Sequence, residues 1–295
     1  MAYQLPEGIE DRPIVVIGGG TLGRRIAAVF ASGGASVRLV DPAAEQREAA
    51  LAYVEQTAPE LRARLDREQE RPLGEVEVHE DPESAVPGAW LVIEAIPERL
   101  DLKRPLFGSL DRIADADALL ATNSSSYASR EVITEVEHPE RVLNMHFAMP
   151  PASMAVELMS DSKTAEGALE FLARELPAFG IMPFIAHRES TGFIFTRIWA
   201  AIKRESLAVV AEGVSTPADV DAIMKANLGM AKGPFESMDG VGLDVVLDIE
   251  EHYREQFPWI PAESRDLVKS YVDAGKLGRK SGEGFYRYDG EGESA

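Results

Sequence analysis

An α/β domain built on a parallel sheet, followed by an all-helical domain, is the fold class that the sequence predicts. Short apolar runs alternate with helical segments through the first two thirds of the 295-residue chain. The first run, Ile14–Ile17, is apolar on both faces, as in a parallel strand covered by helices on each side. Strand signals fade after Ser190, and long helices follow. We therefore predict two domains, residues 1–188 and 189–295.

A glycine-rich turn follows the first strand. The segment Gly18–Gly23 reads GGGTLG and fits the pattern G-x-G-x-x-G. In that pattern the first glycine permits a sharp turn, the second lets the backbone approach a pyrophosphate, and the third lets helix and strand pack closely. A helix is expected from Arg24, with its N-terminal amides facing the phosphates. The predicted cofactor contacts in this turn are Gly18, Gly20, Thr21, Leu22 and Gly23.

An acidic residue ends the second predicted strand, residues 36–40. Asp41 lies 18 residues after Gly23. Its carboxylate can accept hydrogen bonds from both ribose hydroxyls of NAD and would repel the 2′-phosphate of NADP. The alternative is a simple turn without a ligand. Strand, glycines, helix, strand and acid occur in order within one unit, which favours a Rossmann-type NAD-binding domain.

The remaining elements follow from hydrophobic patterning. Residues 43–71 are expected to form two amphipathic helices interrupted at Pro59. The helix predicted at 194–212 is apolar round much of its circumference, which favours burial inside the domain or in a dimer interface. Further helices are expected at 220–226 and 242–257. Further strands are expected at 75–79, 89–93, 118–122, 141–145, 154–159 and 181–185.

Composition limits the possible partners. Thirty basic and fifty acidic residues give a net charge of −20, which argues against nucleic acid and against anionic membrane surfaces. The chain has no cysteine, which excludes disulfides and thiol chemistry. No apolar run approaches the ~18 residues that span a bilayer, and the N-terminal residues lack the features of a secretory signal. We expect a cytoplasmic protein with a small-molecule substrate and, without metal-ligand spacing, no metal.

His146 and Glu157 are the leading catalytic candidates. His146 ends the apolar strand at 141–145 on the predicted cofactor edge, and histidine is suited to proton transfer to and from a carbonyl oxygen. Glu157 lies in an apolar strand, where burial is costly without a partner. A histidine would satisfy this carboxylate and be oriented by it. The alternatives are a histidine that merely ends a strand and a glutamate that faces solvent.

Three serines follow the predicted strand at 118–122, at its carboxyl end. A hydroxyl of Ser124, Ser125 or Ser126 could hydrogen-bond a substrate oxygen. The alternative is an N-cap for the next helical segment. No G-x-S-x-G context supports a serine nucleophile.

Together these motifs resemble the 3-hydroxyacyl-CoA dehydrogenase family, over residues 14–288. The resemblance implies an NAD domain followed by a helical domain that forms a homodimer. The segments that carry it are GGGTLG with Asp41, VIEAIPE (92–98), TNSSS (122–126), NMHF (144–147), STGFIFTR (190–197), GPFESMDGVGLD (233–244) and GRKSGEGFY (278–286).

The resemblance also implies residue roles. His146 is similar to the family's catalytic base, Glu157 to the acid that orients it, and Ser125 to the serine that binds the substrate oxygen. In oxidation, His146 would take the hydroxyl proton while a hydride passes from the substrate carbon to NAD. Further cofactor-contacting positions implied by the family are Glu98, Lys103, Asn123 and Lys280.

Two positions depart from the family pattern beside the substrate. The family commonly reads H-F-F-N-P where this chain has His146-Phe147-Ala148-Met149-Pro150, and it has asparagine where Thr196 stands. Met149 and Thr196 are therefore expected at the substrate. The first hypothesis is a 3-hydroxyacyl-CoA or related 3-hydroxy acid as substrate. The second is a non-CoA substrate, such as a free hydroxy acid, sugar acid, ketone or imine, and the third is an NAD-binding protein without catalytic activity.

Overall fold

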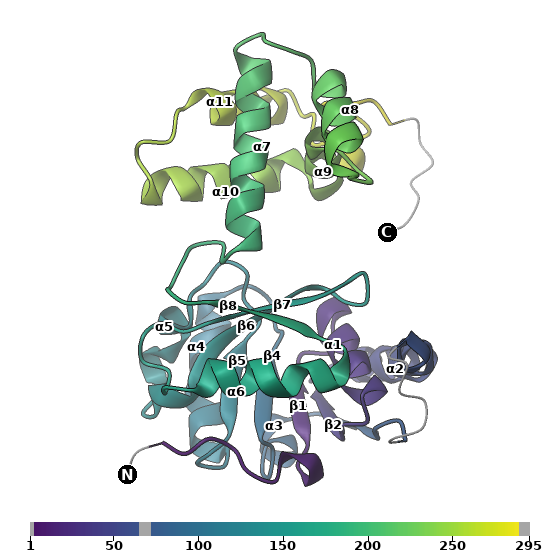
Figure 1. Cartoon of the computed structure of the whole chain (residues 1–295), viewed down its shortest axis with the longest axis vertical. Helices are drawn as coiled ribbons and strands as arrows, with labels where there is room; N and C mark the ends of the chain where they lie inside the picture. Colours follow the sequence, from purple (N-terminus) through teal and green to yellow (C-terminus); the bar gives the residue numbers. More distant parts are fainter. Residues whose placement is uncertain (1–2, 65–71, 289–295) are drawn as a thin grey trace. The chain divides into compact units, whose positions relative to one another are not determined.

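The chain folds into two compact units. The computed structural model describes residues 3–64 and 72–288. Its compact units comprise residues 1–194 and 195–295. The first is an α/β unit and the second is helical (Figure 1).

An eight-stranded sheet forms the centre of the first unit, in the order β3-β2-β1-β4-β5-β6-β7-β8. Each expected strand is present, with ends shifted by a few residues. The strands are β1 (Ile14–Ile17), β2 (Val37–Val40), β3 (Val76–His79), β4 (Leu91–Glu94), β5 (Leu119–Thr122), β6 (Val142–Met149), β7 (Ser153–Met159) and β8 (Met182–Ala186).

The sheet is parallel except where β6 meets β7. That antiparallel pair places His146 directly opposite Glu157. The register shifts between Phe147 and Met149, at the end of β6. At the other side of the sheet, β1 has β2 and β4 as neighbours, so the strand order reverses there. In open parallel sheets, ligands bind outside the carboxyl ends of the strands at such a reversal.

Helices cover both faces of the sheet, which explains why strands such as β1, β4 and β5 are buried along their whole length. One face packs on α1 (Thr21–Ser32), α2 (Ala44–Arg64) and α6 (Ala168–Glu175), with Phe30 and Phe147 fully enclosed (Figure 1). The other packs on α3 (Pro82–Ala85), α4 (Leu100–Ile113) and α5 (Ser129–Val132), around Phe107 and Leu110.

The expected pair of helices at 43–71 is wrong for the part that the structure describes. A single helix, α2, runs from Ala44 to Arg64 with Pro59 inside it. Proline removes one helical hydrogen bond, but Val54, Ala58 and Leu61 are buried in the core shared with α1, and this packing outweighs the local preference. The rest of the predicted segment, residues 65–71, lies outside the described residues.

The second unit is helical, as predicted. Leu207, Phe235 and Val268 form the centre of its core. The predicted helix at 194–212 corresponds to α7, whose Ile198 remains 56% exposed in the single chain. The helices are α7 (Phe195–Ala211), α8 (Pro217–Leu228), α9 (Pro234–Val241), α10 (Leu243–Gln256) and α11 (Glu263–Asp273).

Short 3-10 segments complete the description. They are η1 (Ile9–Asp11), η2 (Ile133–Glu135), η3 (Pro139–Arg141), η4 (Leu176–Phe179) and η5 (Arg279–Ser281). Within the described ranges, none of the helices combines the length and apolar character that a membrane crossing needs.

Candidate active site

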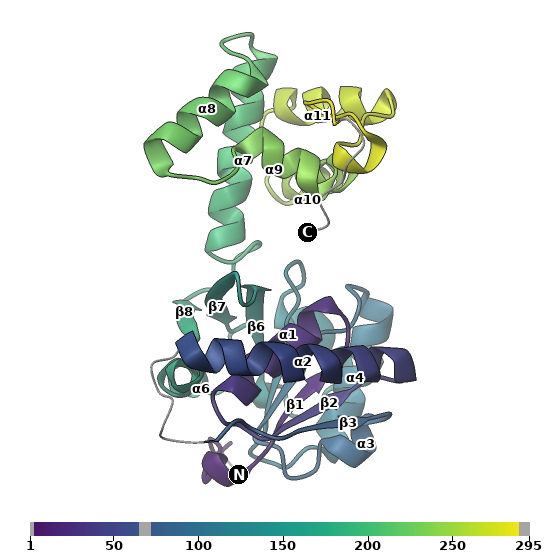
Figure 2. The same cartoon turned by 90° about the vertical axis from the view of Figure 1, so that its right-hand side faces the viewer.

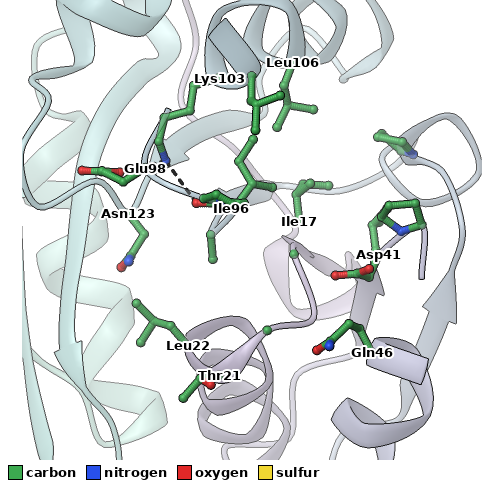
Figure 3. Close-up of a pocket in the computed structure, with 18 of the residues that line it drawn as sticks. Ile17, Thr21, Leu22, Asp41, Gln46, Ile96, Glu98, Lys103, Leu106 and Asn123 are labelled. Atoms are coloured by element: carbon green, nitrogen blue, oxygen red, sulfur yellow. Dashed lines mark hydrogen bonds and ion pairs between the residues drawn. The ribbon is translucent and has the colours of Figure 1, made fainter. Parts of the chain in front are cut away.

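A crevice of about 1070 Å³ opens at the carboxyl ends of the parallel strands in the first unit. Figure 3 shows Asp41 and Gln46 on one side of it, Asn123 and Glu98 on the other, and Thr21 and Leu22 between them. Ser125 and His146 also line the crevice. Its volume is at the upper end of the range for small-molecule sites, as an extended dinucleotide requires.

The glycine turn has the geometry that its motif predicts. Gly18 has φ +106°, and a Cβ there would lie 2.7 Å from the carbonyl oxygen of Ala95. A Cβ on Gly23 would lie 1.7 Å from the carbonyl oxygen of Gly18. A Cβ on Gly20 would meet nothing within 4 Å, so the space beside this backbone is open for a ligand. These observations fit a pyrophosphate held against the start of α1.

Asp41 is fixed at the edge of the crevice by two backbone amides. Its Oδ2 accepts a hydrogen bond from Gly19 N at 2.8 Å, and its Oδ1 accepts one from Ala43 N at 2.9 Å. Each carboxylate oxygen has a second lone pair and can still accept a ribose hydroxyl. The residues present therefore fit NAD.

A buried ionic network lies behind the opposite wall. The Lys103 ammonium donates to Glu94 Oε1 at 2.6 Å and lies 3.2 Å from Glu98 Oε2. Thr122 Oγ1 and Ile96 N also donate to the Glu94 carboxylate, at 2.7 and 2.8 Å. Burial raises the pKa of the Glu94 carboxyl, and the Lys103 charge opposes this rise. Lys103 borders the crevice, but its charge is already held by two carboxylates.

The serine loop divides its roles between neighbours. Ser124 Oγ donates to Glu98 Oε1 at 2.5 Å and accepts from Tyr127 N at 2.8 Å, so this hydroxyl stabilises the turn. Ser126 N also donates to Glu98. Ser125 is exposed and lines the crevice. None of the three serines is the N-cap of the next helix, because Ala128 occupies that position in α5, and Ser124 stabilises the preceding turn instead. Of the three, Ser125 is the one that lines the crevice.

Two asparagines tie β6 to the elements beside it. Asn123 Oδ1 accepts from Phe147 N at 2.8 Å, next to His146. Asn144 Oδ1 accepts from Ser129 N, and its Nδ2 donates to Tyr127 O, at 2.7 and 2.9 Å. Asn123 therefore borders the crevice and also fixes the strand that carries the histidine.

His146 and Glu157 form a hydrogen-bonded pair. His146 Nδ1 lies 3.2 Å from Glu157 Oε2, and the carboxylate is only 8% exposed. A carboxylate accepts, so Nδ1 carries the proton and Nε2 keeps its lone pair. Glu157 Oε1 accepts from Ile194 N at 2.7 Å. The solvent-facing alternative for Glu157 is therefore not what the structure has.

Phe193 fixes the plane of the imidazole. The rings of His146 and Phe193 stack with centroids 5.0 Å apart and an interplanar angle of 22°. Phe193 has φ +54°, a left-handed conformation that costs a bulky residue of order 1–3 kcal/mol. Because Phe193 keeps this unfavourable conformation while it stacks on His146, the surrounding structure must hold it in place.

Three further predicted site residues are divided between the two units. Met149 is 45% exposed at the end of β6 and does not line the crevice. Thr196 and Lys280 belong to the second unit, where both carboxylate oxygens of Asp244 accept from Lys280 at 2.5 Å. Across the described residues, no group of three or more histidine or acidic side chains could hold a metal ion.

Sequence reasoning missed three contributors to the site, namely Glu94, Thr122 and Phe193. Glu94 could have been found, because an acid directly after an apolar strand and buried with it must have a partner. Thr122 at the end of the next strand is the matching donor. Phe193 left no comparable signal, since its role depends on a backbone conformation.

Two protein-family models match the chain, one over most of the first unit and one over most of the second. The model of the 3-hydroxyacyl-CoA dehydrogenase NAD binding domain matches residues 13–187. The model of the 3-hydroxyacyl-CoA dehydrogenase C-terminal domain matches residues 192–288. NAD is accordingly the cofactor.

Relatives match over most of their length. A probable 3-hydroxybutyryl-CoA dehydrogenase of Bacillus subtilis (strain 168) is 32% identical over 95% of this chain and 99% of its own. A 5-formyl-3-hydroxy-2-methylpyridine 4-carboxylate 5-dehydrogenase of Mesorhizobium japonicum is 29% identical, over 95% of this chain and 92% of its own. The crystal structure of (S)-3-hydroxybutyryl-CoA dehydrogenase from Ralstonia eutropha has TM-score 0.82 and 27% identity, over 94% of this chain and 99% of that one. The chain belongs to the 3-hydroxyacyl-CoA dehydrogenase family of NAD-dependent oxidoreductases.

Proposed function

We propose that this chain interconverts a 3-hydroxyacyl-CoA, or a related 3-hydroxy acid, and its 3-oxo form, with His146 as the acid and base. The observation that carries the proposal is the His146–Glu157 pair, 3.2 Å apart, with the imidazole at a crevice also lined by the glycine turn and Ser125. NAD, when bound, supplies the nicotinamide carbon that accepts or returns the hydride.

The proton moves through the free nitrogen of the imidazole. Glu157 holds the proton on Nδ1, so Nε2 accepts the substrate hydroxyl proton during oxidation and returns it during reduction. The positive charge that then develops on His146 is stabilised by the buried Glu157 carboxylate. Ser125 holds the substrate oxygen in position by a hydrogen bond.

NADH consumption with acetoacetyl-CoA tests this function. We expect turnover by the wild type and little turnover by the variant His146→Ala. His138→Ala is the matched control, because His138 is a 59% exposed loop histidine beside Glu140. Equal turnover by the wild type and His146→Ala would remove the proposed base.

We further propose the cofactor contacts. Backbone amides of the glycine turn hold the pyrophosphate, and Asp41 accepts from the ribose. The change Asp41→Ala should weaken NAD binding and relax discrimination against NADP. Unaltered cofactor preference would contradict the ribose role. The other proposed contacts are Glu98, Lys103, Asn123 and Lys280.

A non-CoA substrate is the second candidate. It is favoured by Thr196, which replaces a family asparagine expected at the substrate. Met149 replaces the second asparagine, at the end of β6 and outside the crevice lining. The relative from Mesorhizobium japonicum, named for a pyridine carboxylate substrate, supports such variation within the family. A panel of free hydroxy acids, ketones and imines separates the two candidates, and a strong preference for CoA esters would exclude the second.

The helical unit is proposed to form a homodimer. Ile223 and Leu228 on α8 are 60% and 62% exposed, and such apolar side chains favour an interface. Light scattering should give twice the chain mass, and a monomer at micromolar concentration would contradict this.

A cytoplasmic location is also proposed. Cell fractionation tests it, and activity found in the membrane fraction or the secreted fraction would contradict it.

A further inference from the structure

Two arginines directly after the glycine turn share one aromatic ring. Arg24 and Arg25 lie in the first turns of α1, and their guanidinium carbons are 5.5 and 5.7 Å from the ring centroid of Tyr53. Tyr53 belongs to α2, which packs alongside α1 (Figure 2). The two cations therefore occupy one small region of the molecule, which we name the arginine pair.

The arginine pair lacks a counter-charge. Within the part of the chain that the structure describes, neither guanidinium forms an ion pair with an acidic side chain. The Nε atoms of both are buried without an acceptor. The hydrogen bond of Arg25 goes from Nη1 to the carbonyl oxygen of Pro150, at 3.0 Å. Acidic residues outnumber basic ones by 50 to 30 in this chain, so two adjacent unneutralised cations call for an anion.

The position of the pair links it to the substrate side of the crevice. Arg25 lies one helical turn beyond Thr21 and Leu22, both of which line the crevice. Its partner Pro150 follows β6, the strand that carries His146, and Ala148 on the same strand is also part of the lining. The arginine pair thus lies between the glycine turn and the end of β6, the strand that carries His146.

The chemistry of the pair selects oxygen anions. Guanidinium groups present planar forks that match carboxylate and phosphate oxygens in a bidentate manner. Contact with the Tyr53 ring holds both side chains and partly removes their hydration, which strengthens binding of an anion.

We propose that Arg24 and Arg25 bind the anionic group of the substrate, either a phosphate of a CoA thioester or the carboxylate of a free hydroxy acid. This inference rests on the proposed function for its location, since it names the substrate class of the same site. A neutral substrate leaves the two charges without a partner.

The test compares charged and neutral substrates in a double variant. Arg24→Gln/Arg25→Gln is assayed in the reductive direction with acetoacetyl-CoA, with acetoacetate, and with acetoacetyl-N-acetylcysteamine, which lacks both phosphate and carboxylate. We expect KM for the anionic substrate to rise about tenfold or more, the effect of losing charged hydrogen bonds. KM for the neutral thioester and the affinity for NADH should change less than about twofold.

Two further variants protect the comparison. Arg174→Gln removes an exposed arginine that stacks on Phe171 at 5.1 Å, so it matches the loss of charge and of ring contact and should leave KM unchanged. Arg24→Lys/Arg25→Lys keeps the charge without the fork and should recover part of the lost affinity. It also serves as the test protein if the glutamine variant does not fold.

Each outcome decides the proposal. A KM rise for acetoacetyl-CoA alone identifies a phosphate, and a rise for acetoacetate identifies the carboxylate. An equal rise for the neutral thioester overturns the proposal, as does a parallel loss of NADH affinity, which would assign the pair to the cofactor. Equilibrium binding of CoA and acetoacetate to the enzyme–NAD complex needs no turnover. Binding that the variant loses supports the site even if the proposed reaction fails, and failure of both compounds to bind the wild type overturns it.

Discussion

Two pairs of a carboxylate and a nitrogen-bearing side chain, one at the end of β4 and the other across β6 and β7, differ in how fully their hydrogen-bonding groups are satisfied. Lys103 and Glu94 are 2.6 Å apart, with side chains 1% and 0% exposed. His146 and Glu157 are 3.2 Å apart, with side chains 11% and 8% exposed. We call Lys103–Glu94 the closed pair, because both side chains are fully buried. We call His146–Glu157 the open pair, because its histidine is partly exposed at the crevice.

This difference indicates that the closed pair stabilises the fold and that the open pair can transfer a proton. The Lys103 ammonium contacts Glu94, Glu98 and the carbonyl oxygen of Ile96, which uses its three protons. His146 uses only Nδ1, and among the described residues Nε2 has no hydrogen-bond partner. A group that keeps a free lone pair at a crevice can exchange a proton with a substrate, whereas a saturated ammonium holds structure.

The largest effect is expected at the open pair. His146→Gln keeps the size and polarity of the side chain but cannot act as an acid or base. We expect kcat to fall by about 10²–10⁴-fold, the usual contribution of general acid–base catalysis. NADH affinity should not change. Steady-state rates with NADH and acetoacetyl-CoA measure this, and a fall of less than threefold would place the proton transfer elsewhere.

Disruption of the closed pair should lower the stability of the protein. Lys103→Met leaves Glu94 buried without its cation, which we expect to lower the free energy of unfolding by about 3–5 kcal/mol. Without the opposing Lys103 charge, the pKa of the Glu94 carboxyl rises further above its unfolded value. Stability from such a group is lost as pH rises through the folded pKa, so the variant should be less destabilised at pH 5 than at pH 8.

Urea unfolding of the apoprotein at both pH values measures this effect. Lys269→Met is the control, because Lys269 is 48% exposed and pairs with Asp273 on one helix face. Its loss should cost about 0.5 kcal/mol at most. A Lys103 variant as stable as this control would show that the closed pair does not support the fold.

A smaller effect is expected from the partner in the open pair. Glu157→Gln keeps an acceptor for Ile194 N but removes the charge that stabilises the protonated imidazole. We expect kcat to fall about 10–100-fold, the kinetic equivalent of a lost charged hydrogen bond. Circular dichroism should show an intact fold. If Glu157→Gln lowered the free energy of unfolding as much as Lys103→Met does and left the kcat of the folded enzyme unchanged, the His146–Glu157 pair would also be structural.

The smallest effect is expected in the serine loop. Ser124→Ala removes the acceptor of Tyr127 N and a donor to Glu98, at a cost of about 1 kcal/mol in unfolding free energy. Ser126→Ala is the control, since Ser126 contributes its backbone N–H to this network. Thermal unfolding of both variants checks the difference, and equal midpoints would contradict the assigned role of Ser124.

Much of the first unit could be predicted, because each strand and the glycine turn carry local signals. Apolar runs predicted most of the eight strands, and β1, β4 and β5 are buried along their whole length, whereas the edge strands β3 and β8 are partly exposed. The spacing from Gly23 to Asp41 predicted the edge of the sheet that binds the cofactor. The break expected at Pro59 does not occur, because burial of the residues around it against α1 outweighs the loss of one hydrogen bond.

The pairs themselves could be predicted only in part. The sequence placed His146 and Glu157 in separate strands, and only the antiparallel register between β6 and β7 puts them opposite each other. The stacking of Phe193 depends on its own left-handed backbone conformation, and the saturation of Lys103 depends on three acceptors that the segment 94–98 presents to α4. Such contacts arise from the tertiary fold and have no periodic signature.

A double-variant cycle tests the central claim, that His146 and Glu157 act as one unit. Single-turnover oxidation of enzyme-bound NADH by acetoacetyl-CoA is followed at the nicotinamide absorbance for His146→Gln, Glu157→Gln and the double variant. We expect the double variant to be no slower than His146→Gln alone, because Glu157 acts only through the imidazole. Rate losses that multiply across the two changes would contradict it.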